Sequence, residues 1–464
     1  MKTRKLLLAA AMLLPALGWA EAPNYIFYFI GDGMGIAQVT NSQLYNARVL
    51  GSDTPLLMTT FPVASMATTH SASSDVTDSA AAGTALSTGV KTKNGMLGMD
   101  PDTTAVTSIA KVLQAKGYGI GLVTSVAIDD ATPGAFYANV DNRNRYYDVG
   151  RQLAQSGYQF AAGASLRGAW DKQGNDTDLM NYFEEANVSV HYGLDGLDTT
   201  ADRLLVLSPT HKEKQNEIGY TIDSIAGALT LPALTQAGLD QLMRVSPDRF
   251  FMMVEGGNID HAGHGNDGGT ILREVINFND ALKIAYDFYL RHPDETLIVV
   301  TADHETGGMS VGCKTTGYSV QLDKLAGQKV SKEEFGNICR SILNSRRIYT
   351  WEDMKELMRE KLGIGVNVHL SEAEMQSLHR MFDDVFEKRA SGLDQSTLYA
   401  TFDGFTNEVF NLLNAKAGVG WTTPNHSGMP VPVYAVGVEA SKFSALNDNT
   451  DLPRKILEIV GVNQ

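Results

Sequence analysis

Two short segments of the chain concentrate the side-chain types that bind metal ions. The first, residues 255–264, reads Glu-Gly-Gly-Asn-Ile-Asp-His-Ala-Gly-His, and the second, residues 301–308, reads Thr-Ala-Asp-His-Glu-Thr-Gly-Gly. Carboxylate oxygens and imidazole nitrogens are common ligands of zinc, and glycine lets the backbone approach an ion closely. Asp260 and His264 are four residues apart, so one helical turn or a tight loop places both on the same side. The two segments together predict one metal centre.

Two details of the candidate ligands depend on local backbone shape. Asp303 and His304 are adjacent in the second segment. Neighbouring residues of an extended chain point apart, so both bind one ion only on a bend, which the glycines nearby permit. A third candidate ligand, His426, lies in the loop-like sequence Thr-Pro-Asn-His-Ser-Gly. Taken alone, it is typical of an ordinary loop histidine.

A candidate nucleophile, Ser79, lies in the sequence Thr-Asp-Ser-Ala-Ala-Ala-Gly. A serine followed by small residues is expected at the start of a helix, where free N–H groups and the helix dipole favour an anion. The simpler interpretation is a helix-capping serine on a packing helix, which is common. No Gly-x-Ser-x-Gly elbow surrounds Ser79, so the sequence does not indicate an esterase triad. A serine activated by a metal ion fits better.

Short apolar runs of the chain explain how distant segments reach one site. Five runs predict buried strands, and helix-like segments at 107–116 and 272–291 lie between them: 24–30, 120–124, 250–254, 297–301 and 433–438. This alternation predicts an α/β sheet, mostly parallel and covered by helices on both faces. Polar clusters follow the first four runs at 31–33, 129–132, 255–260 and 303–304. Because carboxyl ends of parallel strands line the ligand crevice, these clusters are expected to meet there.

Six motifs in the same order and with the same local spacing give the chain a family resemblance. They are Ile30-Gly-Asp32-Gly-Met-Gly35, Thr77-Asp78-Ser79-Ala80-Ala81, Asp130-Ala-Thr132-Pro133, Glu255-Gly-Gly with Asp260 and His264, Thr301-Ala-Asp303-His304, and His426-Ser-Gly. On these motifs the chain resembles the alkaline phosphatase family. The resemblance implies a large, mostly parallel central sheet flanked by helices on both faces. It also implies three metal ions, two of zinc and one of magnesium.

The resemblance assigns ligands to each ion. One zinc ion is expected at Asp260, His264 and His426, a second at Asp32, Asp303 and His304, and the magnesium ion at Asp32, Thr132 and Glu255. The last set offers only oxygen atoms, which suits a hard cation.

Catalytic and substrate-binding roles are carried over in the same way. Ser79 is expected as the nucleophile, and Arg143, at the family's spacing from Asp130, as the arginine that binds phosphate through its planar fork. Asp78 is expected to orient Arg143, and His261 and Asp130 to take part in substrate binding. The resemblance thus implies hydrolysis of small phosphate monoesters through a phosphoserine intermediate.

Two other functions remain open at this stage. A related two-metal phosphodiesterase or phosphonate hydrolase would use the same metals and nucleophile, because these do not fix how many ester groups the pocket accepts. An exported metal-binding protein without turnover is the third hypothesis. It predicts loss of the nucleophile or the arginine, whereas Ser79 and Arg143 are both present.

Composition and the N-terminal segment set the class of protein. The 464 residues carry a formal net charge of −15, which argues against a protein that coats nucleic acid. Lys2, Arg4 and Lys5 precede the apolar run 6–17, and small residues follow, so residues 1–20 predict a signal peptide, with cleavage after Ala20 or Ala22. We therefore expect a periplasmic or secreted protein without a membrane span in the mature chain. A homodimer stays open.

The rest of the chain divides into segments that differ in composition and in the spacing of apolar residues. Residues 23–312 and 421–464 are expected to form the α/β catalytic domain, and the charged, amphipathic segment 313–420 an inserted helical subdomain or lid. Residues 157–237 are less regular and predict peripheral loops and short elements. The two cysteines, Cys313 and Cys339, either pair in an oxidising compartment or remain as buried thiols.

Overall fold

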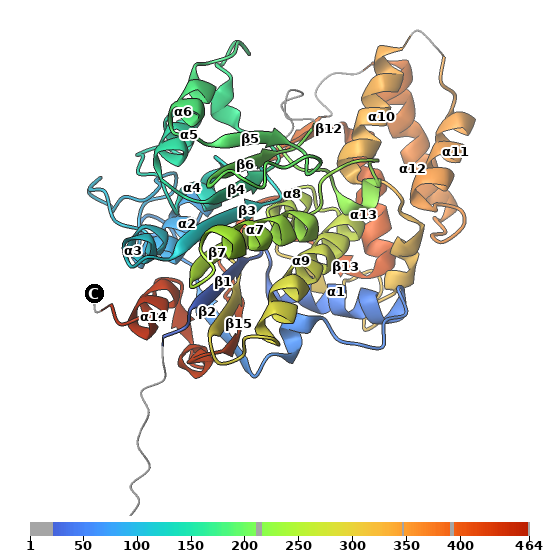
Figure 1. Cartoon of the computed structure of the whole chain (residues 1–464). Coiled ribbons are helices and arrows are strands. Elements are labelled where there is room, and N and C mark those ends of the chain that lie inside the picture. The colour runs from blue at the N-terminus through green and yellow to red at the C-terminus, as the bar shows by residue number, and fades with distance from the viewer. Residues whose placement is uncertain (1–21, 210–215, 346–347, 390–393, 463–464) are drawn as a thin grey trace, which may run out of the picture.

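A computed structural model describes residues 22–209, 216–345, 348–389 and 394–462. The expected signal peptide, residues 1–20, lies outside the described residues. A ten-stranded sheet runs through the centre of the molecule (Figure 1). In sheet order its strands are β16 (Asn447–Asp448), β2 (Val63–Thr68), β15 (Val431–Gly437), β8 (Thr296–Thr301), β1 (Tyr25–Ile30), β7 (Phe250–Glu255), β3 (Gly119–Thr124), β4 (Phe160–Gly163), β6 (Leu204–Leu207) and β5 (Ser189–Tyr192).

The four central strands are those expected to carry the site. β8, β1, β7 and β3 are adjacent, parallel and fully buried. Their residues are mainly Ile, Val, Phe, Tyr and Met, which suit a strand packed on both faces. The paired register aligns Ile30, Glu255 and Thr301 at the carboxyl ends. The predicted mostly parallel α/β sheet is therefore confirmed.

One strand of the sheet runs against the others. β15 pairs antiparallel with both β8 and β2, whereas the other described ladders of this sheet are parallel. An antiparallel strand begins where its parallel neighbours end. The loop that precedes β15, which contains His426, therefore lies at the same edge as the loops that follow β1, β7 and β8.

Fourteen α-helices occur in the described residues and pack around the sheet. Their bounds are α1 (Ile36–Arg48), α2 (Ser79–Thr88), α3 (Ile109–Ala115), α4 (Ala131–Gly134), α5 (Tyr146–Gln155), α6 (Leu179–Glu185), α7 (Leu231–Val245), α8 (Asn258–His264), α9 (Gly268–Tyr289), α10 (Lys332–Asn344), α11 (Trp351–Leu362), α12 (Glu372–Phe382), α13 (Gly404–Ala417) and α14 (Asp451–Ile459). Short helical turns are η1 (Leu57–Thr60), η2 (Arg167–Ala169), η4 (Thr221–Asp223), η5 (Leu322–Gly327), η6 (Asp383–Glu387) and η7 (Ala440–Phe443).

Close packing of α7 on the sheet depends on two glycines of β3. A Cβ atom on Gly121 would lie 2.8 Å from Leu242 Cδ1, and one on Gly119 would lie 2.5 Å from Ser246 Cβ. Side chains alternate along a strand, so Ile120 and Leu122 point to the opposite face. α3 and α4 also contact β3, and α9 packs on α7 and β8. Because glycines alternate with Ile120 and Leu122, β3 packs closely against α7 on one face and places large side chains on the other.

Residues 157–237 contribute more to the core than the sequence indicated. They supply β4, β6 and β5, which extend the main sheet beyond β3. Each of these strands has only four residues, and β4 and β6 are wholly buried. Runs this short are hard to distinguish from loops by pattern alone.

The segment 313–420 contains mainly helices, as its amphipathic pattern of charged and apolar residues predicts. α10, α11 and α12 lie together at one side of the molecule in Figure 1, away from β2 and β15. α13 contacts α10, α12 and η5, and η5 also contacts α1. Short strand pairs within or beside this segment are β11 (Gln395–Ser396) with β12 (Thr401–Phe402) and β10 (Ser310–Val311) with β13 (Val419–Gly420). The division into two domains stays a prediction.

Two further expectations concern the chain as a whole. Cys313 and Cys339 are free thiols, Cys313 partly exposed and Cys339 buried in α10, so the disulfide alternative is not formed. Among the described residues, every helix is too short or too polar to cross a lipid bilayer.

Candidate active site

The polar clusters that follow the central strands meet at one edge of the sheet, as predicted. Asp32 follows β1, Asp260 lies in α8 after β7, and Asp303 and His304 follow β8. His426 joins them from β14 (His426–Ser427), which pairs with β9 (Glu305–Thr306) directly after the β8 loop. Chain segments far apart in sequence thus place their ligand-type side chains in one buried cluster.

The first group of metal-type side chains is Asp32, Asp303 and His304. His304 Nε2 lies 3.2 Å from Asp303 Oδ2 and 3.5 Å from Asp32 Oδ1, and all three residues are buried. The backbone N–H of Gly33 donates to the other oxygen of Asp303 at 3.1 Å. One ligand atom of each residue lies within 4.8 Å of the others, so the three can bind a single ion.

The second group is Asp260, His264 and His426. His264 Nδ1 donates to the carbonyl of Pro424 at 2.6 Å, and His426 Nδ1 donates to that of Thr77 at 2.9 Å. Each Nε2 therefore has a lone pair when its ring is neutral, and the two Nε2 atoms are 3.1 Å apart. They lie 3.4 and 3.6 Å from the carboxylate oxygens of Asp260. Two lone pairs this close to a carboxylate favour a cation between them.

The two groups are contiguous. The rings of His304 and His426 stack with centroids 3.5 Å apart. Ligand atoms of Asp260, His304 and His426 also lie within 4.8 Å of one another, so His304 borders both groups. The site therefore consists of two adjoining groups of candidate ligands that meet at His304.

The expected oxygen-only group, Asp32, Thr132 and Glu255, lies beside these two groups. Glu255 Oε2 accepts a hydrogen bond from Thr124 Oγ1 at 2.5 Å, and Thr132, in α4, is buried close to the same carboxyl group. Burial raises the pKa of Glu255 to about 8, although the hydrogen bond from Thr124 opposes the shift. Asp32 lies near enough to Glu255 for the two carboxylates to repel each other.

Electrostatics mark the cluster as unfavourable without cations. Burial, together with the nearby Asp260, raises the pKa of Asp303 to about 7, and burial with Asp303 raises that of Asp32 well above its usual range. Burial and the neighbouring His426 hold the pKa of His304 well below that of a free histidine.

Unpaired oxygens point to the same conclusion. Within the described ranges, four buried side-chain oxygens of the cluster lack a hydrogen-bond partner: Asp32 Oδ1, Asp260 Oδ2, Asp303 Oδ2 and Thr132 Oγ1. An unpaired buried polar group costs about 1–3 kcal/mol, and more when charged. The donor set therefore fits bound metal ions.

Ser79 begins α2 and faces the cluster. Its Oγ lies 3.2 Å from His304 Nε2, and its side chain is buried. The helix cap is the preceding Asp78, whose Oδ1 accepts the N–H of Ala81 at 2.9 Å. The expected helix start is thus confirmed, but Ser79 is the first helical residue rather than the cap. Its hydroxyl is free of a capping role.

Arg143 lies beside Ser79's helix in a cluster with Asp78 and Asp130, which we call the phosphate clamp after the role that the family resemblance leads us to expect. Arg143 Nη2 donates to Asp130 Oδ1 at 2.9 Å, and its Nη1 lies 3.6 Å from Asp78 Oδ2. The same Asp130 is also approached by Arg167, whose Nη1 is 3.4 Å from Oδ2. The sequence pattern gave no reason to select Arg167.

His261 occupies the wall of the cluster with two partners that sequence reasoning missed. Its Nδ1 lies 2.5 Å from Glu217 Oε1, and the ring of Tyr399 covers it with centroids 3.7 Å apart. Tyr399 also meets His264 edge-on at 5.2 Å. Both partners come from segments without a motif, so only the fold could reveal them.

Comparison with known proteins agrees with this architecture. The sequence matches the family model described as alkaline phosphatase over residues 22–166 and 151–462. Alkaline phosphatase 4 of Bacillus subtilis (strain 168) is 29% identical over 451 residues, covering 95% of this chain and 89% of that protein. The human tissue-nonspecific isozyme of alkaline phosphatase is 28% identical over 346 residues, covering 63% of this chain and 65% of that protein.

Solved structures give the same result. A cold-active alkaline phosphatase from the psychrophile Shewanella sp. has a TM-score of 0.76 at 26% identity, covering 94% of this chain and all of that one. Thermus thermophilus alkaline phosphatase has a TM-score of 0.76 at 26% identity, covering 99% of this chain and 96% of that one. The family model spans most of the sequence, and the fold agrees over nearly its whole length. The chain therefore belongs to the alkaline phosphatase family.

Proposed function

We propose that the protein is an exported alkaline phosphatase that hydrolyses phosphate monoesters through a phosphoserine intermediate on Ser79. One observation carries the proposal. Ser79 Oγ lies 3.2 Å from His304, at the border of two largely buried groups of candidate metal ligands, with the guanidinium of Arg143 nearby. A nucleophile, a cationic fork and unpaired carboxylates are the parts that phosphoryl transfer needs.

Two zinc ions and one magnesium ion complete the proposed site. Asp260, His264 and His426 would hold one zinc ion, Asp32, Asp303 and His304 the second, and Asp32, Thr132 and Glu255 the magnesium ion. When bound, such ions lower the pKa of a hydroxyl nucleophile and stabilise charge on the departing oxygen. Mixed nitrogen and oxygen donors suit zinc, and oxygen donors alone suit magnesium.

The chain's own residues define the reaction. Arg143 donates N–H groups to two non-bridging oxygens of the phosphate, while Asp78 and Asp130 keep its guanidinium in place. Ser79 Oγ then loses its proton and attacks phosphorus, the bond from phosphorus to the alcohol oxygen breaks, and the alcohol leaves after that oxygen takes up a proton. Water hydrolyses the phosphoserine, which releases inorganic phosphate and restores the serine. His261 and Asp130 line the phosphate position.

Export is proposed from residues 1–20 of the sequence. The basic residues Lys2, Arg4 and Lys5 and the apolar run 6–17 have the pattern of a signal peptide. Action outside the cytoplasm would suit an enzyme that frees phosphate from diverse esters.

Replacement of the nucleophile tests the proposal. Ser79→Ala removes the attacking oxygen but none of the proposed metal ligands, so hydrolysis of p-nitrophenyl phosphate should fall by more than about a thousandfold. Zinc content, measured by mass spectrometry on the same preparation, should not change. Turnover equal to that of the wild type would rule out Ser79 as the nucleophile.

A second measurement addresses the rival diesterase function. On wild-type protein, kcat/KM for p-nitrophenyl phosphate should exceed that for bis-p-nitrophenyl phosphate. The reverse order would make the protein a phosphodiesterase on the same scaffold.

A further inference from the structure

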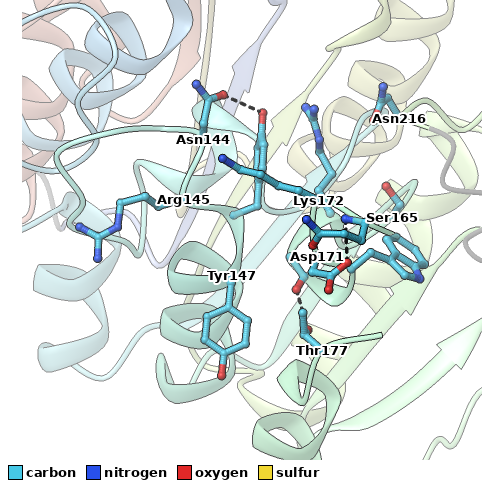
Figure 2. Close-up of a pocket in the computed structure, with 13 residues that line it drawn as sticks. Asn144, Arg145, Tyr147, Ser165, Asp171, Lys172, Thr177 and Asn216 are labelled. Carbon is cyan, nitrogen blue, oxygen red and sulfur yellow. Dashed lines mark hydrogen bonds between the residues drawn. The ribbon is translucent and has the colours of Figure 1, made fainter. Parts of the chain in front are cut away.

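A cavity of about 650 Å³ opens beside the phosphate clamp (Figure 2). Its walls come from the start of α5, from η2 and from the turn after η2, and they include Tyr146, Trp170 and Lys172. A space of this size holds a small organic molecule rather than a phosphate group alone. We name it the leaving-group cavity.

One carboxylate joins the leaving-group cavity to the phosphate clamp. Asp130 Oδ1 accepts from Arg143 at 2.9 Å, and Asp130 Oδ2 lies 3.4 Å from Arg167, which lines the cavity. The two guanidinium groups are therefore separated by the width of one carboxylate. An ester whose phosphate is bound by Arg143 can place its alcohol half beside Arg167.

The orientation of Arg167 is fixed by its surroundings. Its backbone N–H and that of Gly168 donate to the two oxygens of the buried Asp129, at 2.8 and 2.7 Å. Its guanidinium lies over the ring of Tyr146, 4.0 Å from the centroid. The group is thus held at the junction of cavity and clamp, with N–H donors beyond the one that meets Asp130.

Cations outnumber free anions in the leaving-group cavity. Asp171, the only carboxylate among the described lining residues, accepts hydrogen bonds from Asn175 and from the N–H of Gln173 within its own turn. Lys172 forms no ion pair with any residue that the structure describes. In Figure 2 it lies between Arg145 and Ser165. In a chain of net charge −15, this concentration of positive charge is local.

Arg145 differs from the other two cations because it has two carboxylate partners, whereas Arg167 shares the single carboxylate of Asp130 with Arg143. Arg145 pairs with Asp141 and Asp148 at 2.9 Å each, and its side chain is about half exposed. Its charge is therefore already balanced.

We propose that the leaving-group cavity binds the alcohol part of phosphate monoesters that carry a second anionic group, with Arg167 and Lys172 as the residues that recognise that group. This inference rests on the proposed phosphomonoesterase activity and adds a substrate class to it. Phosphate esters of carboxylated or doubly phosphorylated alcohols belong to that class. The phosphate that reacts is bound by Arg143. The second anionic group takes the place of water beside Arg167 and Lys172.

Matched pairs of substrates isolate the second charge. In 4-carboxyphenyl and 4-carbamoylphenyl phosphate, the ring and the position of an electron-withdrawing group are the same, but only the former carries a further charge. The 3-substituted pair tests a second geometry. For at least one pair, wild-type kcat/KM should favour the carboxylate on the order of tenfold, the effect of one charge-assisted hydrogen bond.

Three variants assign that preference to residues. Arg167→Gln and Lys172→Gln should each reduce the carboxylate preference at least about threefold, because each removes one cation that faces the second anion. Arg145 lines the same cavity, but its charge is already paired with two carboxylates. Arg145→Gln should therefore leave the preference for the carboxylated ester unchanged. The control excludes a general effect of net charge.

The outcomes separate the two proposals. The proposed substrate class is wrong if wild-type kcat/KM is the same for the two esters of each pair. It is also wrong if Arg167→Gln and Lys172→Gln both keep the full wild-type preference for the carboxylated ester. If Arg167→Gln slows both esters of a pair equally, Arg167 only positions Asp130, which also overturns it. Failure of the wild type to hydrolyse any of the four esters would instead contradict the phosphomonoesterase activity.

Discussion

Gly33 shows how a residue without a side chain supports the candidate metal centre. Its φ of +71° is a backbone conformation that L side chains rarely adopt. A Cβ atom there would lie 2.8 Å from Thr306 Oγ1 and 2.9 Å from the Cα of Asp260. The glycine therefore allows the loop after β1 to pass directly against two other segments of the site.

We expect Gly33→Ala to damage both stability and metal binding. Strain in the left-handed conformation costs about 1–2 kcal/mol, and the clash must also displace Asp260. Zinc content and the thermal midpoint of the variant should both fall. Gly51→Ala is a matched control, because Gly51 has a φ of +72° but nothing within 4 Å of its missing Cβ. The same loss of zinc in both variants would show that the contact at Gly33 is unimportant.

Some residues of the site were predictable from the sequence, and others were not. Pattern and spacing were enough to predict that Asp260, His264 and Asp303 come together, because all three follow the carboxyl end of a central strand. Their role as metal ligands stays a prediction. Arg167 and Tyr399 approach the site through the packing of distant segments, and no local pattern encodes such an approach.

Helix ends connect the sheet to the helical segment. Asp267 caps α9 by accepting the N–H of Thr270, and its other oxygen accepts the N–H of Lys332 at the start of α10, at 2.6 Å. The Nζ of Lys332 donates to the carbonyl of Gly265, just after α8, at 2.8 Å. One buried lysine and one carboxylate thus bind three helices together.

This junction predicts a pH dependence of stability. Burial lowers the pKa of Lys332 from 10.5 to about 8, although Asp267 and Asp403 oppose the shift. Between these values the unfolded chain binds the proton and the folded chain does not, so this group makes the fold more stable as pH rises from 8 to 10.5. Below pH 8 both states are protonated, and the cost of burying the charge is constant.

Urea unfolding at several pH values measures the effect. Relative to Lys332→Met, the wild type should gain up to about 1.4 kcal/mol of unfolding free energy per pH unit between pH 8 and 10.5. Lys283→Met, at a side chain that is mostly exposed, should follow the wild type. A constant difference between wild type and Lys332→Met across this range would contradict the buried titration.

The strand elements explain why the fold was predictable only in part. Apolar composition predicted five buried runs, and all five are strands of the main sheet. The reversed direction of β15 was not predictable, because a run of apolar residues has the same pattern in either direction. That reversal brings His426, which precedes its strand, to the edge where the other candidate ligands follow theirs.

At the scale of the whole molecule, the carboxylates of the site are a source of instability that bound cations would relieve. Asp32 and Asp303 are buried, repel each other and have raised pKa values. Ions that bind the folded chain but not the unfolded one stabilise it by mass action, by about 2.7 kcal/mol at a hundredfold excess over Kd.

Chelation should therefore lower the thermal midpoint. We expect a fall of several degrees when EDTA removes the metal, and recovery when zinc and magnesium are added back. Ser79→Ala should respond in the same way, since it keeps the ligands. An unchanged midpoint, with metal loss verified by mass spectrometry, would mean that ions do not contribute to the stability of the fold.

The antiparallel course of β15 has a consequence for the making of the protein. Asp32 is synthesised near the start of the chain, whereas His426 emerges only after the helical segment is complete. Until then the ligand set is incomplete, and β8 lacks its neighbour on one edge. A nascent chain therefore cannot assemble the whole set of candidate ligands before His426 has left the ribosome. Full phosphatase activity therefore becomes available only after synthesis has passed the loop that carries His426.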